Sequence, residues 1–304
     1  MVKNKKFKHV LVVLGGTSNE RSVSLESGKA CIKALKSLNY KISTIDPKKK
    51  NFNLIDKSKT EVIFNALHGK NGEDGLAQSY FEYLRIPYTH SGIISSFNAM
   101  NKVISKEIFK KNKLLTPNYF IINKREYNFS KLNLLIRKKN LLFPIVVKPV
   151  NEGSSIGVKI ARTLKIFKKS VESLLKKYDK LMIEKYIPGQ EIQVAVLNGK
   201  SLGAIELVPK RLFYDYKAKY TKKAKTKHIM PARLNKKNYK KILKIAEDAH
   251  SSLKCRGVSR SDFKFYKGKF YLLEINTQPG MTSLSLVPEI AAYRGITFPK
   301  LVEK

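Results

Sequence analysis

The segment from Arg260 to Gly280 constrains the fold of this chain more than any other stretch. Two runs rich in aromatic and apolar residues, 260–266 and 270–276, flank a short Gly-containing turn, which predicts a β-hairpin. If the loop is the three residues 267–269, Asp262 lies directly opposite Glu274. A two-residue loop would turn Asp262 to the other face of the hairpin. The side chain that shares a face with Glu274 therefore depends on the register of this turn.

The hairpin also predicts a metal site. Glu274 and Asn276 are two residues apart on one strand, so both side chains leave the same face. With Asp262 opposite, two carboxylates and an amide oxygen converge, and such oxygen donors suit a hard cation, Mg²⁺ above all. The alternative is an amphipathic hairpin whose polar residues simply face water. The presence of Arg260 in the same short segment favours a site.

Composition limits the class of protein. The chain has 304 residues, which predicts about two domains or one domain with an appended lobe, and 42% hydrophobic residues suffice for ordinary cores. The formal net charge is +38, and only 10 of the 61 basic residues are Arg. The lysines are scattered and no nucleic-acid-binding motif accompanies them, so we interpret the excess as solvated lysine faces. We expect no specific nucleic-acid partner, although nonspecific polyanion binding at low salt remains open.

Membrane and disulfide architectures are disfavoured. The apolar run from Val10 to Leu14 is too short for a signal peptide, and no apolar stretch is long enough to span a bilayer. The two cysteines, Cys31 and Cys255, have neither disulfide-framework nor metal-site spacing. These features predict a cytoplasmic protein without a membrane partner.

The first third of the chain alternates strands and helices. The predicted strands are 9–14, 41–45 and 61–67, and the predicted helices are 21–38 and 74–84. This order predicts a Rossmann-like parallel α/β domain over residues 1–97. The turn after the first strand lacks the G-x-G-x-x-G dinucleotide fingerprint.

The remainder reads as a second unit with antiparallel strands. The predicted helices are 98–113, 164–178 and 236–253, and the predicted strands before the hairpin are 143–149, 158–161, 181–184, 191–197 and 204–208. A further strand is predicted within 114–122, after Thr116-Pro117. Residues 213–231 are polar and lysine-rich, which predicts a mobile loop over a site.

Two further segments suggest a nucleotide site. Lys148 ends a hydrophobic strand just before a glycine-rich loop, where a lysine is costly unless an anion neutralises it. The loop 153–157 can offer backbone N–H groups to phosphate oxygens, although a plain β-turn would read the same way. The strand end at Glu184 resembles a hinge that presents backbone groups to an adenine edge, with Glu191 near the ribose. Each signal alone is weak.

Five segments in this order resemble the ATP-grasp enzymes, and among them the D-alanine–D-alanine ligase family. They are GGTSNERSVS (15–24), HGKNGEDG (68–75), EGSSIG (152–157), YDYKAKY (214–220) and the stretch 260–288. The resemblance covers essentially the whole chain. It implies a pre-ATP-grasp domain (1–97), a small central ATP-grasp lobe (98–183) and a C-terminal catalytic lobe (184–304).

The resemblance implies that ATP phosphorylates one D-alanine and that a second D-alanine attacks the acyl phosphate, for peptidoglycan precursor synthesis. It implies ATP and two Mg²⁺ or Mn²⁺ ions as cofactors, with Asp262, Glu274 and Asn276 as metal ligands. The implied ATP contacts are Lys102, Lys148, Ser155, Glu184, Lys185, Ile187, Glu191 and Phe213. A homodimer formed through the N-terminal domain is also implied.

The same resemblance assigns the acyl-transfer groups. Glu20 matches the carboxylate that binds the ammonium of the first D-alanine, in a hydrogen-bonded set with Ser154 and Tyr220, and His68 matches a histidine near that substrate. The other implied groups are Arg260 and the Gly280 N–H at the oxyanion, Ser285 and the Leu286 N–H at the second carboxylate, and Lys219 near the transferring phosphate.

The sequence departs from the family pattern at three places. The hairpin looks one residue shorter than in some relatives, so its register is the point to check. Leu284 stands where many relatives carry a polar residue, with little effect expected, and the last helix is expected to be short because the sequence ends at Lys304. Three alternatives remain: a ligase joining D-alanine to D-lactate, an ATP-grasp ligase for L-residues, and a basic nucleic-acid-binding protein. Tyr220 argues for an amine nucleophile, and Glu20 disfavours L-substrates.

Overall fold

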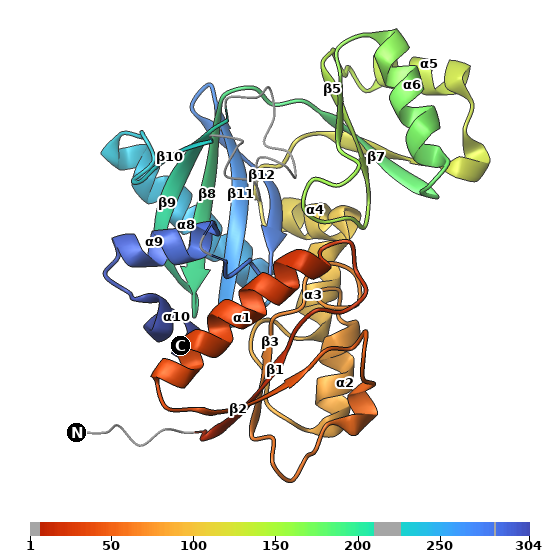
Figure 1. Cartoon of the computed structure of the whole chain (residues 1–304). Coiled ribbons are helices and arrows are strands. Elements are labelled where there is room, and N and C mark those ends of the chain that lie inside the picture. Colours follow the sequence, from red (N-terminus) through yellow and green to blue (C-terminus); the bar gives the residue numbers. More distant parts are fainter. Residues whose placement is uncertain (1–6, 210–225, 283) are drawn as a thin grey trace.

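The structure is a computed structural model that describes residues 7–209, 226–282 and 284–304. Its strands form three sheets, of three, five and four strands (Figure 1). The three-stranded sheet belongs to the N-terminal part of the chain, and the other two build the two lobes that follow it. The predicted mixed α/β class is confirmed.

The N-terminal sheet is parallel, as predicted. Its order is β2 (Lys41–Ile45), β1 (His9–Val13), β3 (Val62–Asn65). Alternate residues of β1 face opposite sides: Val10 and Val12 pack in the core that includes α1 (Arg21–Ser37), while Leu11 and Val13 pack in the core that includes α2 (Leu76–Leu84). A central strand that is apolar on both faces therefore holds one helix on each side.

The core beneath α1 does not end with the N-terminal domain. It continues into side chains of the strands β8 (Gln190–Leu197) and β9 (Lys200–Val208) and of the helices α9 (Leu286–Tyr293) and α10 (Phe298–Glu303). Figure 1 shows α1 lying between the parallel sheet and these C-terminal helices. The N-terminal domain and the catalytic lobe thus share buried apolar surface, which fixes Glu20 at the start of α1 relative to the hairpin.

The single helix predicted over 98–113 is two helices. They are α3 (Ile93–Met100) and α4 (Lys102–Lys111), and Asn101 between them caps α4 by accepting hydrogen bonds from the N–H groups of Val103 and Ile104. The proposed domain boundary at residue 97 falls within α3. The break places Lys102 at the first position of α4 instead of in a helix interior.

The small lobe carries an antiparallel sheet. Its strand order is β4 (Tyr119–Asn123), β7 (Lys180–Lys185), β5 (Ile145–Pro149), β6 (Lys159–Ala161). The sheet packs in one core with α5 (Phe129–Lys138), which the sequence reading did not anticipate, and α6 (Leu164–Leu175). The boundary proposed at residues 183 and 184 falls within β7.

The C-terminal lobe is built on a five-stranded antiparallel sheet. Its order is β10 (Lys227–Ile229), β9 (Lys200–Val208), β8 (Gln190–Leu197), β11 (Val258–Tyr266), β12 (Lys269–Asn276). Helix α8 (Lys236–Ser252) packs on one face. Strand β10 lies inside the segment predicted to be loop, so that prediction is wrong for residues 227–229; residues 210–225 lie outside the described part.

The hairpin of β11 and β12 has the predicted pairing but not the predicted loop. Tyr266 pairs with Lys269, so the loop has two residues, Lys267 and Gly268, both with positive φ. Such a loop would by itself turn Asp262 away from Glu274. A β-bulge between Asp262 and Phe263 adds one residue on β12 and restores the Asp262–Glu274 pair.

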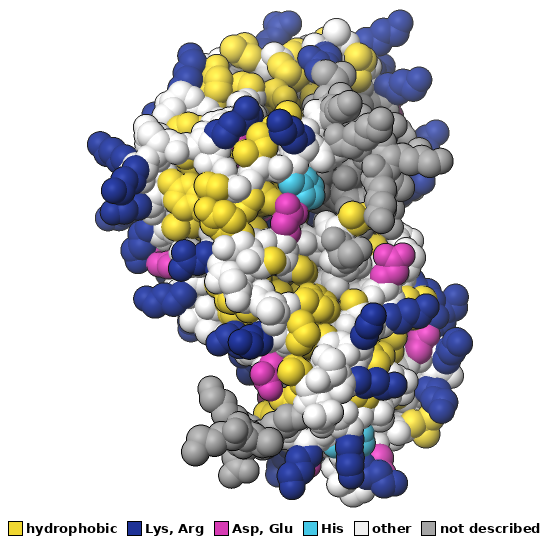
Figure 2. Space-filling model, turned by 60° about the vertical axis from the view of Figure 1, so that its left-hand side comes forward, with side chains coloured by type: hydrophobic (Ala, Val, Ile, Leu, Met, Phe, Trp, Pro, Cys, Tyr) yellow, Lys and Arg dark blue, Asp and Glu magenta, His cyan; other side chains and the backbone are white. Residues whose placement is uncertain are grey.

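Charge is spread over the face seen in Figure 2. The Lys and Arg side chains of the described residues lie in separate groups at its edge and within it, with polar and apolar surface between them. This distribution agrees with solvated lysines and not with one concentrated basic patch on that face. Within the described residues, no helix combines the length and apolar character needed to cross a membrane.

Candidate active site

A cleft between the small lobe and the C-terminal lobe collects the nucleotide residues. Of the eight residues predicted to bind ATP, seven lie in the described part of the chain, and all of them line this cleft. They are Lys102, Lys148, Ser155, Glu184, Lys185, Ile187 and Glu191. Asp262 and Glu274 line the same cleft from the hairpin. The structure therefore brings together residues that are up to 172 positions apart in the sequence, from Lys102 to Glu274.

A network of charged side chains lies in this cleft. The Lys148 Nζ donates to Glu184 Oε2 at 2.7 Å, and the Lys106 Nζ lies 2.5 Å from Glu184 Oε1. All three side chains are buried. Burial acts to raise the pKa of Glu184, but Lys106 and Lys148 outweigh it and hold that pKa below its usual value. Glu184 is therefore a carboxylate held by two cations, a state that burial alone would not permit.

Glu191, which the sequence predicts to lie near the ribose, also has a cation partner. Its Oε2 lies 3.0 Å from Lys264 Nζ, and the two residues pair across β8 and β11. The predicted adenine contact Phe213 lies outside the described residues, as do Lys219 and Tyr220.

A second, smaller cavity adjoins the nucleotide cleft. Its lining includes Glu20, Ser154, Arg260 and Asn276, and it shares Lys102, Glu152 and Glu274 with the first. The shared residues mark the junction where a nucleotide phosphate and a second ligand in the smaller cavity would meet. Lys102 Nζ at this junction donates to the Glu152 carbonyl oxygen and lies 3.7 Å from Glu274 Oε2.

The oxygen donors predicted to hold metal share one face of the hairpin. Asp262 pairs with Glu274, and Arg260 pairs with Asn276. Arg260 forms a bidentate ion pair with Asp262, with Nε–Oδ1 2.8 Å and Nη2–Oδ2 3.1 Å. Two carboxylates and an amide oxygen, with no soft ligand, fit a hard divalent cation. Arg260 contacts Asp262, and Lys102 lies near Glu274, so both carboxylates have a cationic neighbour.

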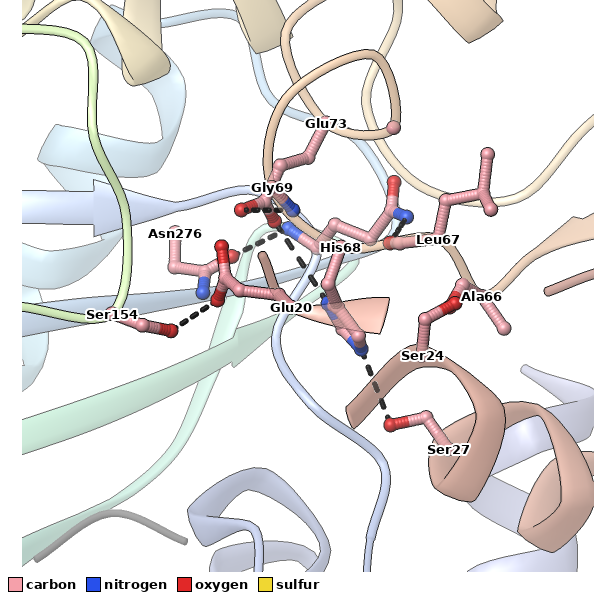
Figure 3. Close-up of polar contacts among 12 residues, drawn as sticks. Glu20, Ser24, Ser27, Ala66, Leu67, His68, Gly69, Glu73, Ser154 and Asn276 are labelled. Carbon is pink, nitrogen blue, oxygen red and sulfur yellow. Dashed lines mark hydrogen bonds and ion pairs between the residues drawn. The ribbon is translucent and has the colours of Figure 1, made fainter. Parts of the chain in front are cut away.

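Glu20 stands at the start of α1, and loops from two other parts of the chain approach its carboxylate. Ser154 donates to its Oε1 (Figure 3). A Cβ added at Gly69 would lie 2.6 Å from Glu20 Oε2, and one at Gly153 would lie 3.0 Å from it. Glycine at these two positions lets both backbones approach the carboxylate.

His68 lies next to this carboxylate and forms a polar chain. Its Nε2 is 3.2 Å from Ser27 Oγ, which accepts a hydrogen bond from the Met281 N–H, and its Nδ1 is 4.0 Å from Glu73 Oε2 (Figure 3). The chain links the loop at residue 68 to the turn after Gly280. Glu73, whose other oxygen accepts the Gly69 N–H, also lines the smaller cavity, although the sequence alone predicted no role for it.

The turn after β12 brings Gly280 against Ser285. A Cβ on Gly280 would lie 2.8 Å from Ser285 Oγ. Ser285 Oγ also accepts the Thr282 N–H at 3.0 Å and sits at the N-terminus of α9, where Leu286 is the first helical residue. The unsatisfied N–H groups and dipole of a helix N-terminus favour a carboxylate there.

Comparison with known proteins identifies the architecture. The family described as "D-ala D-ala ligase C-terminus" matches residues 108–304. A D-alanine–D-alanine ligase of Pelagibacter ubique is 55% identical over 97% of this chain and 96% of its own length. This chain belongs to the D-alanine–D-alanine ligase family. A second ligase of that name, from Geotalea uraniireducens, is 41% identical over 98% of this chain and 94% of its own.

Solved structures of the family share the fold. The Bacillus anthracis D-alanine–D-alanine ligase complexed with ATP superposes with a TM-score of 0.82 at 33% identity, over 97% of this chain and 94% of that chain. The VanG D-Ala:D-Ser ligase of Enterococcus faecalis has a TM-score of 0.84 at 26% identity, over 98% of both chains. Family membership thus rests on sequence and on fold together, and it bears out the resemblance found in the sequence.

Proposed function

We propose that the protein joins two D-alanine molecules in an ATP-dependent reaction that releases ADP and phosphate and supplies a peptidoglycan precursor. The observation that carries the proposal is the junction at Lys102, Glu152 and Glu274. There a cleft lined by nucleotide-binding residue types meets a cavity lined by Glu20, which is suited to an ammonium group. Membership of the D-alanine–D-alanine ligase family supports the same assignment.

In the first half-reaction a D-alanine carboxylate oxygen attacks the γ-phosphorus of ATP, and ADP leaves. Glu20, held by Ser154, binds the substrate ammonium so that the carboxylate points toward the junction. Lys102 and Lys148 contact the phosphates, the loop at Ser155 covers them, and Lys185, Ile187 and Glu191 hold the nucleoside. Positioning and charge neutralisation account for most of the catalysis in such a transfer.

In the second half-reaction the amine of another D-alanine attacks the acyl phosphate, and phosphate leaves from the tetrahedral intermediate. Ser285 and the Leu286 N–H hold the carboxylate of this second substrate at the start of α9. Arg260 and the Gly280 N–H stabilise the developing oxyanion. His68 orients the first substrate. The roles of Lys219 near the transferring phosphate and of Tyr220 beside Glu20 and Ser154 are assigned by resemblance alone.

Asp262, Glu274 and Asn276 would hold two Mg²⁺ or Mn²⁺ ions. When bound, the ions would neutralise phosphate charge and polarise the transferring group.

The activity is tested by ADP release in the presence of Mg²⁺, with D-alanine added or omitted. D-alanine-dependent release together with the dipeptide product supports the proposal. Depsipeptide formation with D-lactate in preference to the dipeptide would instead identify the alternative ligase. D-serine is a third substrate to compare, because a related structure is named a D-Ala:D-Ser ligase.

We further propose a cytoplasmic homodimer whose subunit has an N-terminal domain, a small lobe and a C-terminal lobe, one around each of the three sheets. ATP as substrate and the two free cysteines favour the cytoplasm. Large apolar side chains exposed on α2 and α3, namely Leu76, Ile94 and Phe97, favour a second copy docking on the N-terminal domain. Light scattering of the wild type and of Phe97→Glu tests the dimer, and a monomeric wild type would refute it.

A further inference from the structure

Lys106 is a fully buried cation to which the reaction gives no role. It lies one turn after Lys102 on α4 and has 0% exposure. A lysine removed from water is costly unless its charge is compensated. Its Nζ has two close partners, Glu184 Oε1 at 2.5 Å and Thr116 Oγ1 at 2.5 Å. Lys106 lies behind Glu184, which faces the nucleotide cleft, and it is not among the residues that line the cleft.

The charges around Glu184 do not cancel. Lys148, on the cleft side, holds Oε2 of the same carboxylate at 2.7 Å. With Lys106, Glu184 and Lys148 all ionised, the cluster carries one net positive charge. If Glu184 had Lys148 as its only cation, the pair would be neutral and Lys148 would be held to the carboxylate. The second lysine shares the charge of the carboxylate, so it weakens the hold of Glu184 on Lys148.

We infer that Lys106 is a positioning residue that neutralises Glu184 from behind and so keeps the charge of Lys148 available to a nucleotide phosphate. This inference rests on the proposed ATP site but not on the identity of the amino-acid substrates. It assigns Glu184 an electrostatic role as the shared counter-ion of two lysines, in addition to any contact with the adenine.

The surroundings of Lys106 make its charge sensitive to pH. Burial is the main reason that its pKa is lowered to about 8; Glu184 acts in the opposite direction, and Lys148 and Lys110 add to the lowering. From β4, the Tyr119 ring lies 5.4 Å from its Nζ. As pH rises through about 8, Lys106 loses its proton, the cluster becomes neutral, and phosphate binding weakens.

The test compares the affinities of ADP and of adenosine for Lys106→Met, measured by calorimetry. We expect the ADP dissociation constant to rise roughly tenfold, the effect of removing one charge about 10 Å from a phosphate at an effective dielectric constant of about 20. The adenosine dissociation constant should stay within about twofold, because adenosine has no phosphate. The control is Lys111→Met, which removes an equal charge from an exposed position on the same helix.

Equal losses for ADP and adenosine would refute the inference, since they would mean that Lys106 only maintains the shape of the cleft. No loss for either ligand would refute it as well. If Lys106→Met does not fold, the wild type decides: ADP affinity must fall between pH 7 and 9 while adenosine affinity does not, and a flat ADP profile would overturn the inference. Failure of the wild type to ligate D-alanine would refute the proposed function but leave these binding measurements valid.

Discussion

Gly280→Ala tests the close contact between Gly280, which we propose stabilises the oxyanion, and Ser285, which we propose binds the second substrate. The added Cβ would lie 2.8 Å from Ser285 Oγ, whereas about 3.4 Å is the start of ordinary contact. Ser285 or the turn must therefore move by about 0.6 Å or more, and misplacement by about 1 Å can cost a factor of roughly 100 in rate. Gly280 does not have positive φ, so the backbone itself tolerates alanine.

We expect kcat/KM for D-alanine to fall by roughly 10- to 100-fold, with the larger effect on the second substrate. The free energy of unfolding should change by only about 1 to 2 kcal/mol, as for modest overpacking. ADP release at varied D-alanine measures the first quantity, and urea denaturation measures the second.

Gly92→Ala is the matched control, because its Cβ would meet nothing closer than 3.6 Å. If Gly280→Ala kept kcat/KM within twofold of the wild type, the proposed role of this turn would be wrong. If the fall in kcat/KM were explained by unfolding of the variant alone, the proposed role of this turn would also be wrong.

Three further predictions follow from single carboxylates. Asp262→Asn should lower Mg²⁺-dependent ADP release by about 100-fold, whereas Asp248→Asn on the exposed face of α8 should not; equal rates in the two variants would refute the metal assignment. Glu20→Gln should raise the KM for D-alanine at least tenfold while ADP affinity, measured by calorimetry, stays constant; a parallel loss of ADP affinity would argue against an ammonium site. The hydrogen bond from Arg21 is the main cause that lowers the pKa of Asp46 to about 2, so the stability this pair adds is present above pH 4 and is lost as pH falls toward 2. The gap in unfolding free energy between the wild type and Asp46→Asn should close over that range in urea titrations, and a gap that widens would contradict the reasoning.

Much of the candidate site was predictable because local patterns carry it. The period-two spacing of Glu274 and Asn276 puts both on one face of a strand whatever the fold. The strand that ends at Lys148, just before a glycine-rich loop, is likewise recognisable from the local sequence alone. Lys102 and Lys106 are four residues apart, a spacing that puts both on one face of a helix.

Other features were beyond the reach of local patterns. The break between α3 and α4 depends on Asn101 as a cap within an otherwise helical pattern. Glu73 looks like one more loop carboxylate until the fold places it near His68.

The sequence by itself determined the parallel and antiparallel sheets, the family, and the residue types available to the site, because strand periodicity and motif order are properties of the chain. Only the tertiary structure decided which charges meet. The two-residue turn at Gly268 would have separated Asp262 from Glu274, and a bulge on the partner strand restored the pair. The pairing of Lys106 and Lys148 through one carboxylate likewise required a helix and two strands to pack together, since the chain places these residues 42 positions apart. Burial then lowers the pKa of Lys106, and this burial exists only in the folded protein.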